Sequence, residues 1–135
     1  MIATLLFAAL MGQSVETASR DDCEVMLAPA SGAELGWSAT SPAADFFPEI
    51  SLSPGTVYRY DCDWAALGFA KPVIGNPDSK RGFVFTRPTY AADRQSATLE
   101  MTYFIAPHFL QGSRCHVKKV SDAWKSDGCQ VTVIT

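Results

Sequence analysis

The sequence predicts an α+β fold, a short N-terminal helix followed by an antiparallel β-meander in one disulfide-stabilised domain. Three observations support this prediction. Residues 19–28 carry the start signals of a helix, and residues 96–104 alternate between apolar and polar side chains as a half-buried strand does. Four cysteines, an even number in a short chain, indicate a disulfide framework: Cys23, Cys62, Cys115 and Cys129.

The helix is expected to begin at Ser19, whose hydroxyl can cap the first turn. Asp21 and Asp22 then fall where negative charge interacts favourably with the helix dipole. Pro29 and Gly32 are expected to end it.

Strands are predicted wherever β-branched and aromatic residues gather. The segment from 29 to 55, rich in Ala, Ser, Pro and Gly, is expected to be irregular, and residues 71–81 form a loop by composition. The predicted strands are residues 56–60, 82–86, 96–104, 114–120 and 129–134.

The last two strands favour one disulfide pairing. With residues 121–123 as the hairpin loop, Cys115 and Cys129 fall opposite one another, at a spacing that a disulfide can bridge. By elimination, Cys23 would then pair with Cys62. Four cysteines allow three pairings, and the turn signal Asp127-Gly128 could shift the register, so the other pairings stay open.

The N-terminus resembles a secretory signal peptide. Residues 2–11 are apolar and uncharged but too short to cross a bilayer. Small side chains allow cleavage after Ser14 or after Ser19, and the second site is favoured, giving a signal peptide over 1–19 and one exported domain over 20–135. No Lys or Arg precedes the apolar run, and a buried N-terminal helix or strand is the alternative.

We therefore expect a periplasmic or secreted protein. Cys23 follows charged residues and not the small apolar residues that precede a lipidated cysteine, which argues against a lipoprotein. No later stretch is long and apolar enough to span a membrane, so the mature form is expected to lack a membrane span.

Residues 82–99, with the motif Thr-Arg-Pro at 86–88, resemble a pattern in small exported bacterial proteins of unassigned function. Gly112, the strand from 115 to 120 and Trp124 continue this likeness over roughly the last 50 residues, and residues 105–110 depart from it. The resemblance implies a bacterial, non-cytoplasmic β-meander and brings no activity with it.

Composition and motifs give little support for nucleic-acid binding or catalysis. The net charge is −3 with the basic residues spread thinly, which argues against nucleic acid as a partner. Residues 35–39 lack the second glycine of a nucleophile elbow, and two disulfides would leave no free thiol. No cofactor is expected.

Two clusters of titratable residues are candidates for chemical sites. A metal site built from His108 and His116 with Asp122 lacks ligand spacing. Asp61 and Asp63 fit better as a solvated face beside Cys62 than as a cation site. A small hydrolase would need Asp61, Asp63 and His116 within hydrogen-bond reach.

Residues 103–110 form the best candidate contact surface. An apolar, aromatic loop between two strands either packs into the core or marks a binding site. If it is exposed, its anchors would be Phe104, His108, Phe109 and Leu110. The leading hypothesis is a non-catalytic exported module that binds a protein or small ligand; the alternatives are a secreted inhibitor or immunity-type protein and, third, the small hydrolase.

Overall fold

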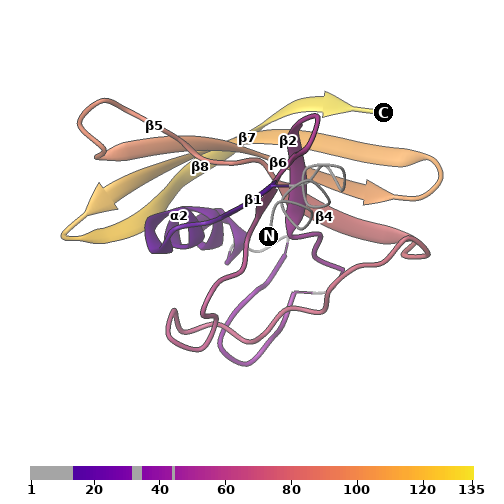
Figure 1. Ribbon diagram of the computed structural model, residues 1–135, viewed down its shortest axis with the longest axis horizontal. Helices are drawn as coiled ribbons and strands as arrows, with labels where there is room; N and C mark the ends of the chain where they lie inside the picture. The colour runs from indigo at the N-terminus through magenta and orange to yellow at the C-terminus, as the bar shows by residue number, and fades with distance from the viewer. Residues whose placement is uncertain (1–13, 32–34, 44) are drawn as a thin grey trace, which may run out of the picture.

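The chain forms one helix and two β-sheets in the computed structural model, which describes residues 14–31, 35–43 and 45–135 (Figure 1). The predicted α+β class is confirmed. The elements, in chain order, are β1 (Ser14–Thr17), α2 (Arg20–Ala30), β2 (Glu49–Ser53), β3 (Thr56–Arg59), β4 (Arg81–Phe85), β5 (Thr89–Tyr90), β6 (Ser96–Ile105), β7 (Phe109–Val120) and β8 (Ala123–Ile134).

The larger sheet, here called sheet B, is the predicted C-terminal meander. Its strands run in the order β4-β6-β7-β8 with antiparallel pairing, and β5 adds to one end of β6. Leu99, Cys115 and Cys129 lie opposite one another on three successive strands, as the alternating pattern requires. β7 begins at Phe109, five residues before the predicted start at Arg114.

Both predicted disulfides are confirmed. Cys115 and Cys129 bridge adjacent strands with a Cα–Cα distance of 4.0 Å, and Cys23 joins α2 to Cys62. The β7–β8 turn is the pair 121–122, both with left-handed φ values of 50° and 65°. The Asp127-Gly128 signal does not make a turn: Gly128 has a φ of 103° and lies in β8 beside a shift of register.

Helix α2 starts where the sequence predicts it. The Asp22 N–H donates to the Ser19 side chain at 3.1 Å, and Asp21 and Asp22 occupy the first turn. The predicted stop at Pro29 is wrong by one residue, because the helix includes Pro29 and ends at Ala30. Proline removes only its own N–H, and the N–H of Ser31 still closes the last turn on the Leu27 carbonyl at 3.0 Å.

The smaller sheet, sheet A, was predicted only in its β3 strand. β2 and β3 form a hairpin around Gly55, whose φ is 83°, and β1 pairs in parallel with β3. The segment 29–55, expected to be irregular, therefore contributes one strand. Sheet A escaped prediction because β1 pairs with residues about 40 positions later in the chain, a non-local contact that no local pattern encodes.

The space between the sheets and the helix is filled by an aromatic core. Trp37 is fully buried, and its ring centroid lies within 6.3 Å of those of Phe46 and Phe83. Its indole N–H donates to the Ala70 carbonyl.

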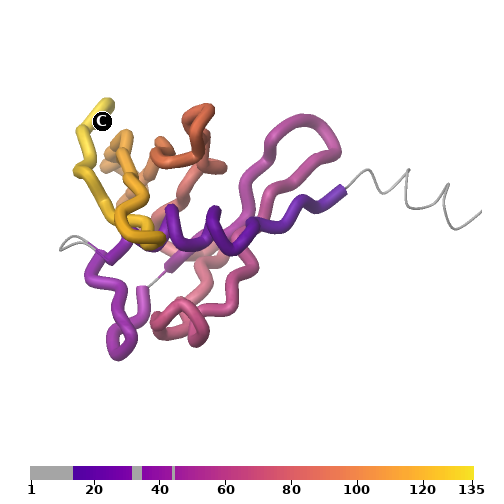
Figure 2. Tube along the Cα trace, turned by 90° about the vertical axis from the view of Figure 1, so that its left-hand side faces the viewer, coloured from indigo at the N-terminus to yellow at the C-terminus, as the bar shows by residue number. Residues whose placement is uncertain are grey.

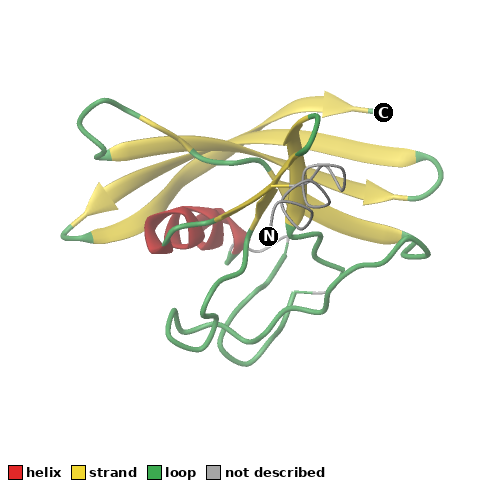
Figure 3. Ribbon diagram, viewed as in Figure 1, coloured by secondary structure: helices red, strands yellow, loops and turns green. Residues whose placement is uncertain are grey.

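Helix α2 covers only the part of sheet B that is near the β7–β8 turn (Figure 3). Seen from the side, the β2–β3 hairpin projects away from sheet B (Figure 2).

The β4 edge of sheet B is closed by the segment around Phe47. The Phe83 N–H donates to the Asp45 carbonyl at 3.1 Å, and the Phe47 N–H donates to the Phe83 carbonyl at 3.0 Å. The Phe47 ring lies over two glycines, where an added Cβ would come within 2.3 Å of it at Gly75 and 2.5 Å at Gly82. The ring and the backbone bonds together occupy this edge.

Candidate functional site

The inner face of sheet B continues past the core into an open, apolar surface. Leu99, Cys115, Met101 and Ser113 are buried, whereas the next pairs along the strands are partly exposed and then exposed. Register pairs Met101 with Ser113, Tyr103 with Gln111, and Ile105 with Phe109. We call this surface the apolar end. It is lined by Leu35, Met101, Tyr103, Ile105, Phe109 and Gln111.

The apolar end encloses a pocket of about 370 Å³. None of its six lining residues carries a charge, so an ionic group entering it would lose hydration without a counter-charge. Ile105 is 44% exposed and Phe109 37% exposed at its rim. Gln111 and the Tyr103 hydroxyl are the polar side-chain groups that the lining offers. The arrangement is that of an apolar binding pocket with few polar groups.

The four predicted anchors do not form one cluster. The predicted loop over 103–110 is wrong: β6 runs to Ile105 and β7 starts at Phe109, which leaves only residues 106–108 for the turn. Phe109 and Leu110 are each 37% exposed and His108 is exposed, so the segment does not pack into the core. Phe104 is half-buried and packs on Phe47 with ring centroids 5.7 Å apart.

Strand periodicity explains this division. Phe104 pairs with Leu110, and Ile105 with Phe109, so that the two pairs face opposite sides of sheet B. Only Phe109 of the predicted anchors lines the pocket. The alternation of Leu99 and Met101, continued along β6, identifies Tyr103 and Ile105 as residues on the pocket side of the sheet. Leu35 reaches the pocket through tertiary packing, which strand periodicity does not encode.

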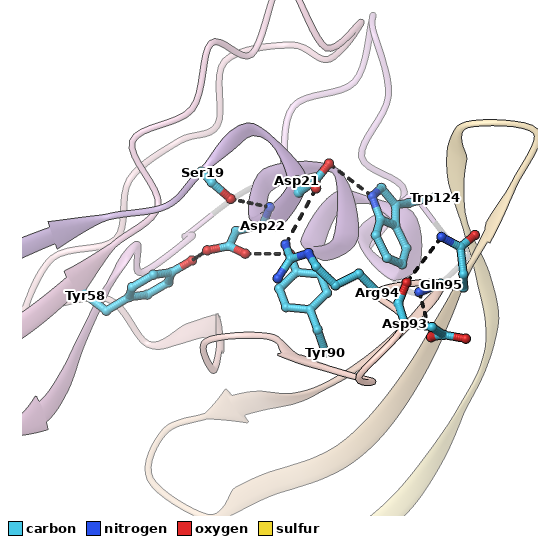
Figure 4. A network of polar contacts seen from close by, with 9 residues as sticks. All are labelled: Ser19, Asp21, Asp22, Tyr58, Tyr90, Asp93, Arg94, Gln95 and Trp124. Carbon is cyan, nitrogen blue, oxygen red and sulfur yellow. Dashed lines mark hydrogen bonds and ion pairs between the residues drawn. The ribbon is translucent and has the colours of Figure 1, made fainter.

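A second candidate lies at the N-terminus of α2, where polar side chains from four elements converge (Figure 4). Asp22 accepts hydrogen bonds from the Tyr58 hydroxyl at 2.7 Å and from the Tyr90 hydroxyl at 2.5 Å. Asp21 accepts from the Trp124 indole at 3.3 Å and lies 3.7 Å from Arg94. From the sequence alone, both acidic residues are predicted only as helix-start signals.

The depression beside this network has a volume of about 480 Å³ and is lined by two arginines, Arg87 and Arg94. The Arg87 guanidinium lies 2.8 Å from Glu16, and the Arg94 guanidinium lies over the Tyr90 ring at 4.1 Å as well as near Asp21. Both arginines that line the depression thus face a carboxylate of the same chain. The network is suited to joining elements together more than to holding a charged ligand.

Burial raises the pKa of three tyrosines above the ordinary value of 10.0: Tyr58, Tyr60 and Tyr90. The hydrogen bonds that Tyr58 and Tyr90 donate to Asp22 raise the pKa of these two hydroxyls further, because ionisation would remove the donated proton. All three hydroxyls are therefore held neutral at physiological pH, as hydrogen-bond donors.

The residues considered for catalysis or metal binding lie in different parts of the fold. Asp61 and Asp63 are exposed after β3, and Asp63 accepts the Ala66 N–H in a turn at 3.3 Å. His116 is on the outer face of sheet B opposite Thr98, His108 is in the β6–β7 turn, and Asp122 is in the β7–β8 turn. Within the described ranges, no three His, Cys, Asp or Glu side chains gather as a metal site.

Comparison of the chain with protein-family models, curated proteins and solved structures found no match. The resemblance of the C-terminal part to small exported bacterial proteins therefore stays a prediction. No helix in the part of the chain that the structure describes has both the length and the apolar character that crossing a bilayer requires.

Proposed function

We propose that this protein is an exported, non-catalytic binding module, and that its apolar end accepts an apolar side chain of a partner protein. One observation carries the proposal: the pocket of about 370 Å³ has a wholly uncharged lining and a rim of exposed Ile105 and Phe109. Exposed large apolar side chains around a concave site are the usual form of a protein contact surface.

The size and chemistry of the pocket favour a Leu-, Met- or Phe-sized group. Full burial of such a side chain contributes about 1.5–3 kcal/mol, which suits an anchor residue at the centre of an interface. Phe109 and Ile105 would close over the anchor from two adjacent strands. Gln111 and Tyr103 supply groups that can hydrogen-bond the backbone of the partner segment.

Export is supported by the cysteines and by the N-terminal sequence. Disulfides form and persist in oxidising compartments, and both pairs are present here. The predicted signal peptide covers 1–19, of which residues 1–13 lie outside the described part of the structure. We infer a periplasmic or secreted protein from these two features together.

Site-specific photo-crosslinking in the producing cells tests the proposal. A photoreactive amino acid at position 109 should give a discrete cross-linked product with a protein. Position 73 is the matched control, because Val73 is 52% exposed but lies outside the apolar end. The product should disappear when Ile105→Asp is added, since a charge at the rim would have to be desolvated to admit the apolar anchor.

Three results would contradict the proposal. Identical products from positions 109 and 73 would indicate non-specific contact, and no product from either position would exclude a stable partner. A small apolar molecule retained in native mass spectrometry, without any cross-linked protein, would assign the pocket to a small ligand instead. If the captured partner is an enzyme whose activity falls on binding, the protein is a module of the inhibitor type.

A further inference from the structure

Among the residues that the structure describes, no strand pairs with the outer edge of β8 in sheet B. Strand β8 ends the strand order β4-β6-β7-β8, whereas the β4 edge at the opposite side is occupied by the backbone around Phe47. All described residues of β8 except Trp124 are exposed. An open edge presents a row of N–H and C=O groups that another strand can pair with.

Hydrogen-bond phase shows which groups of β8 face outward. Thr135 and Leu110 exchange both backbone hydrogen bonds, at 2.9 and 3.1 Å, so Thr135 points its backbone groups toward β7. Alternation places the N–H and C=O of Ile134 on the open edge. Thr132 is the extra residue of a bulge, because the register passes from Val133 to Val131 while β7 advances by one residue, and the strict alternation stops there.

The side chains of this half of β8 are free of charge. Residues 130–135 read Gln-Val-Thr-Val-Ile-Thr, and the exposed fractions are 52% at Val131, 47% at Val133 and 63% at Ile134. The described edge strands of sheet A carry a carboxylate each, Glu16 in β1 and Glu49 in β2. Charged side chains are a common means of keeping a strand edge unpaired, and this half of β8 has none.

We propose that the C-terminal half of β8 pairs with the same segment of a second copy, antiparallel and about a two-fold axis at Val133. The outward-facing N–H and C=O of Ile134 in each copy then lie opposite Thr132 of the other copy and can exchange backbone hydrogen bonds with it. The two Val133 side chains meet directly across the axis. The same segment thus contributes to the interface from both copies, as an isologous interface requires.

The positions of the charged residues favour this register over one in which the whole length of β8 is paired. An axis at Cys129 would place Lys125 opposite Val133 and Asp127 opposite Val131, with each charge against an apolar side chain. The axis at Val133 leaves both charges outside the paired segment. It also extends the apolar end, because Ile134 lies opposite Gln111 on the strand that carries Phe109.

Sedimentation velocity on the purified, disulfide-bonded protein, over a concentration series, tests the dimer. A reversible monomer–dimer equilibrium is expected. Ile134→Pro removes an N–H that faces away from β7, so the fold should survive while two intermolecular hydrogen bonds per dimer are lost. This variant should raise the dimer dissociation constant at least about tenfold.

Ile134→Val is the matched control, since it keeps both the N–H and an apolar β-branched side chain, and it should dimerise as the parent does. Circular dichroism and an intact Cys115–Cys129 disulfide would verify that Ile134→Pro is folded. A monomer at every concentration would overturn the proposal, and so would a dimer that is insensitive to Ile134→Pro. The measurement contains no partner protein, so its outcome is independent of the crosslinking experiment.

Discussion

Asp22 is the residue at which helix and strands are joined by polar contacts. Its backbone N–H completes the Ser19 cap, and its two carboxylate oxygens accept from Tyr58 of β3 and Tyr90 of β5. One half-buried side chain thus connects α2 with both sheets. Hydrogen bonds to a charged acceptor contribute more than neutral ones, so much of the polar stabilisation depends on this carboxylate.

We expect Asp22→Ala to lower the free energy of unfolding by about 3 kcal/mol, because two tyrosine hydroxyls lose a charged acceptor. Urea denaturation of the oxidised protein measures the change. Asp21→Ala is the matched control, with the same charge removed from the same helical turn, and should cost less because Asp21 is bonded only at longer distances. A change within about 0.5 kcal/mol for Asp22→Ala would contradict the role given to this residue.

Stability should also fall at alkaline pH. Tyr58, Tyr60 and Tyr90 have pKa values raised above 10.0 in the folded state, so the unfolded chain releases these protons first and binds fewer of them. Their contribution is complete below about pH 10 and is lost as the pH rises, by up to about 4 kcal/mol per pH unit for three protons. Urea denaturation between about pH 9 and pH 11 measures this slope.

Tyr90→Phe should reduce the alkaline slope by about a third, since it removes one of the three protons. An unfolding free energy that stays constant across the interval, or a slope unchanged in Tyr90→Phe, would show that these hydroxyls ionise equally readily in both states.

At the scale of elements, local sequence patterns were sufficient to predict some helices and strands but not others. The capped helix, the alternating β6 strand and the Cys115–Cys129 register follow from contacts between residues close in the chain. β1 and β2 do not, because β1 pairs with the distant β3 and β2 has a short, serine-rich sequence. The segment 103–110 was predicted as an apolar, aromatic loop between two strands, whereas the pairing of Ile105 with Phe109 extends both strands into it.

The two disulfides should differ in their contribution to stability. Cys23 and Cys62 are 39 residues apart, and Cys115 and Cys129 are 14 apart within one hairpin. Loop-closure entropy gives about 4 kcal/mol for the first and about 3 kcal/mol for the second. Thermal unfolding of the double variants Cys23→Ala/Cys62→Ala and Cys115→Ala/Cys129→Ala should rank them in that order, and the reverse order would contradict it.

Strand β1 also bears on where a leader would be removed. The Ser14 N–H donates to the Gly55 carbonyl at 2.7 Å, and Glu16 pairs with Arg87. A chain starting at Arg20 would lack β1 and the Ser19 cap, whereas one starting at Val15 keeps most of the strand and the cap. We expect the chain from Val15 to be more stable by at least about 1 kcal/mol, the usual value of an N-cap.

If the chain is exported, we expect the mature protein to begin at Val15, although sequence preference alone favoured the site after Ser19. The intact mass of the protein recovered from its producing cells identifies the first residue directly. An N-terminus at Arg20, together with equal unfolding free energies for the two forms, would show that β1 is dispensable.

For the whole molecule, the sequence allowed the class and the disulfide framework to be predicted but not the site. The apolar end depends on Leu35 lying near β6 and β7, and on α2 being too short to cover the full length of sheet B. Neither is a property of any local segment. Tyr103, Ile105 and Phe109 lie within the segment 103–110 predicted as a contact surface, whereas Gln111 joins the site only through the strand register.

The closed β4 edge limits how far the molecules can assemble. At the β4 side of sheet B, Asp45 and Phe47 already use the backbone groups of Phe83, so another strand cannot pair along the whole of β4. Two copies joined through β8 have each used that edge, and β4 is blocked at Phe83 for a third copy. Concentrated solutions should therefore contain pairs of fixed size and not filaments, and thioflavin T fluorescence should stay at its baseline.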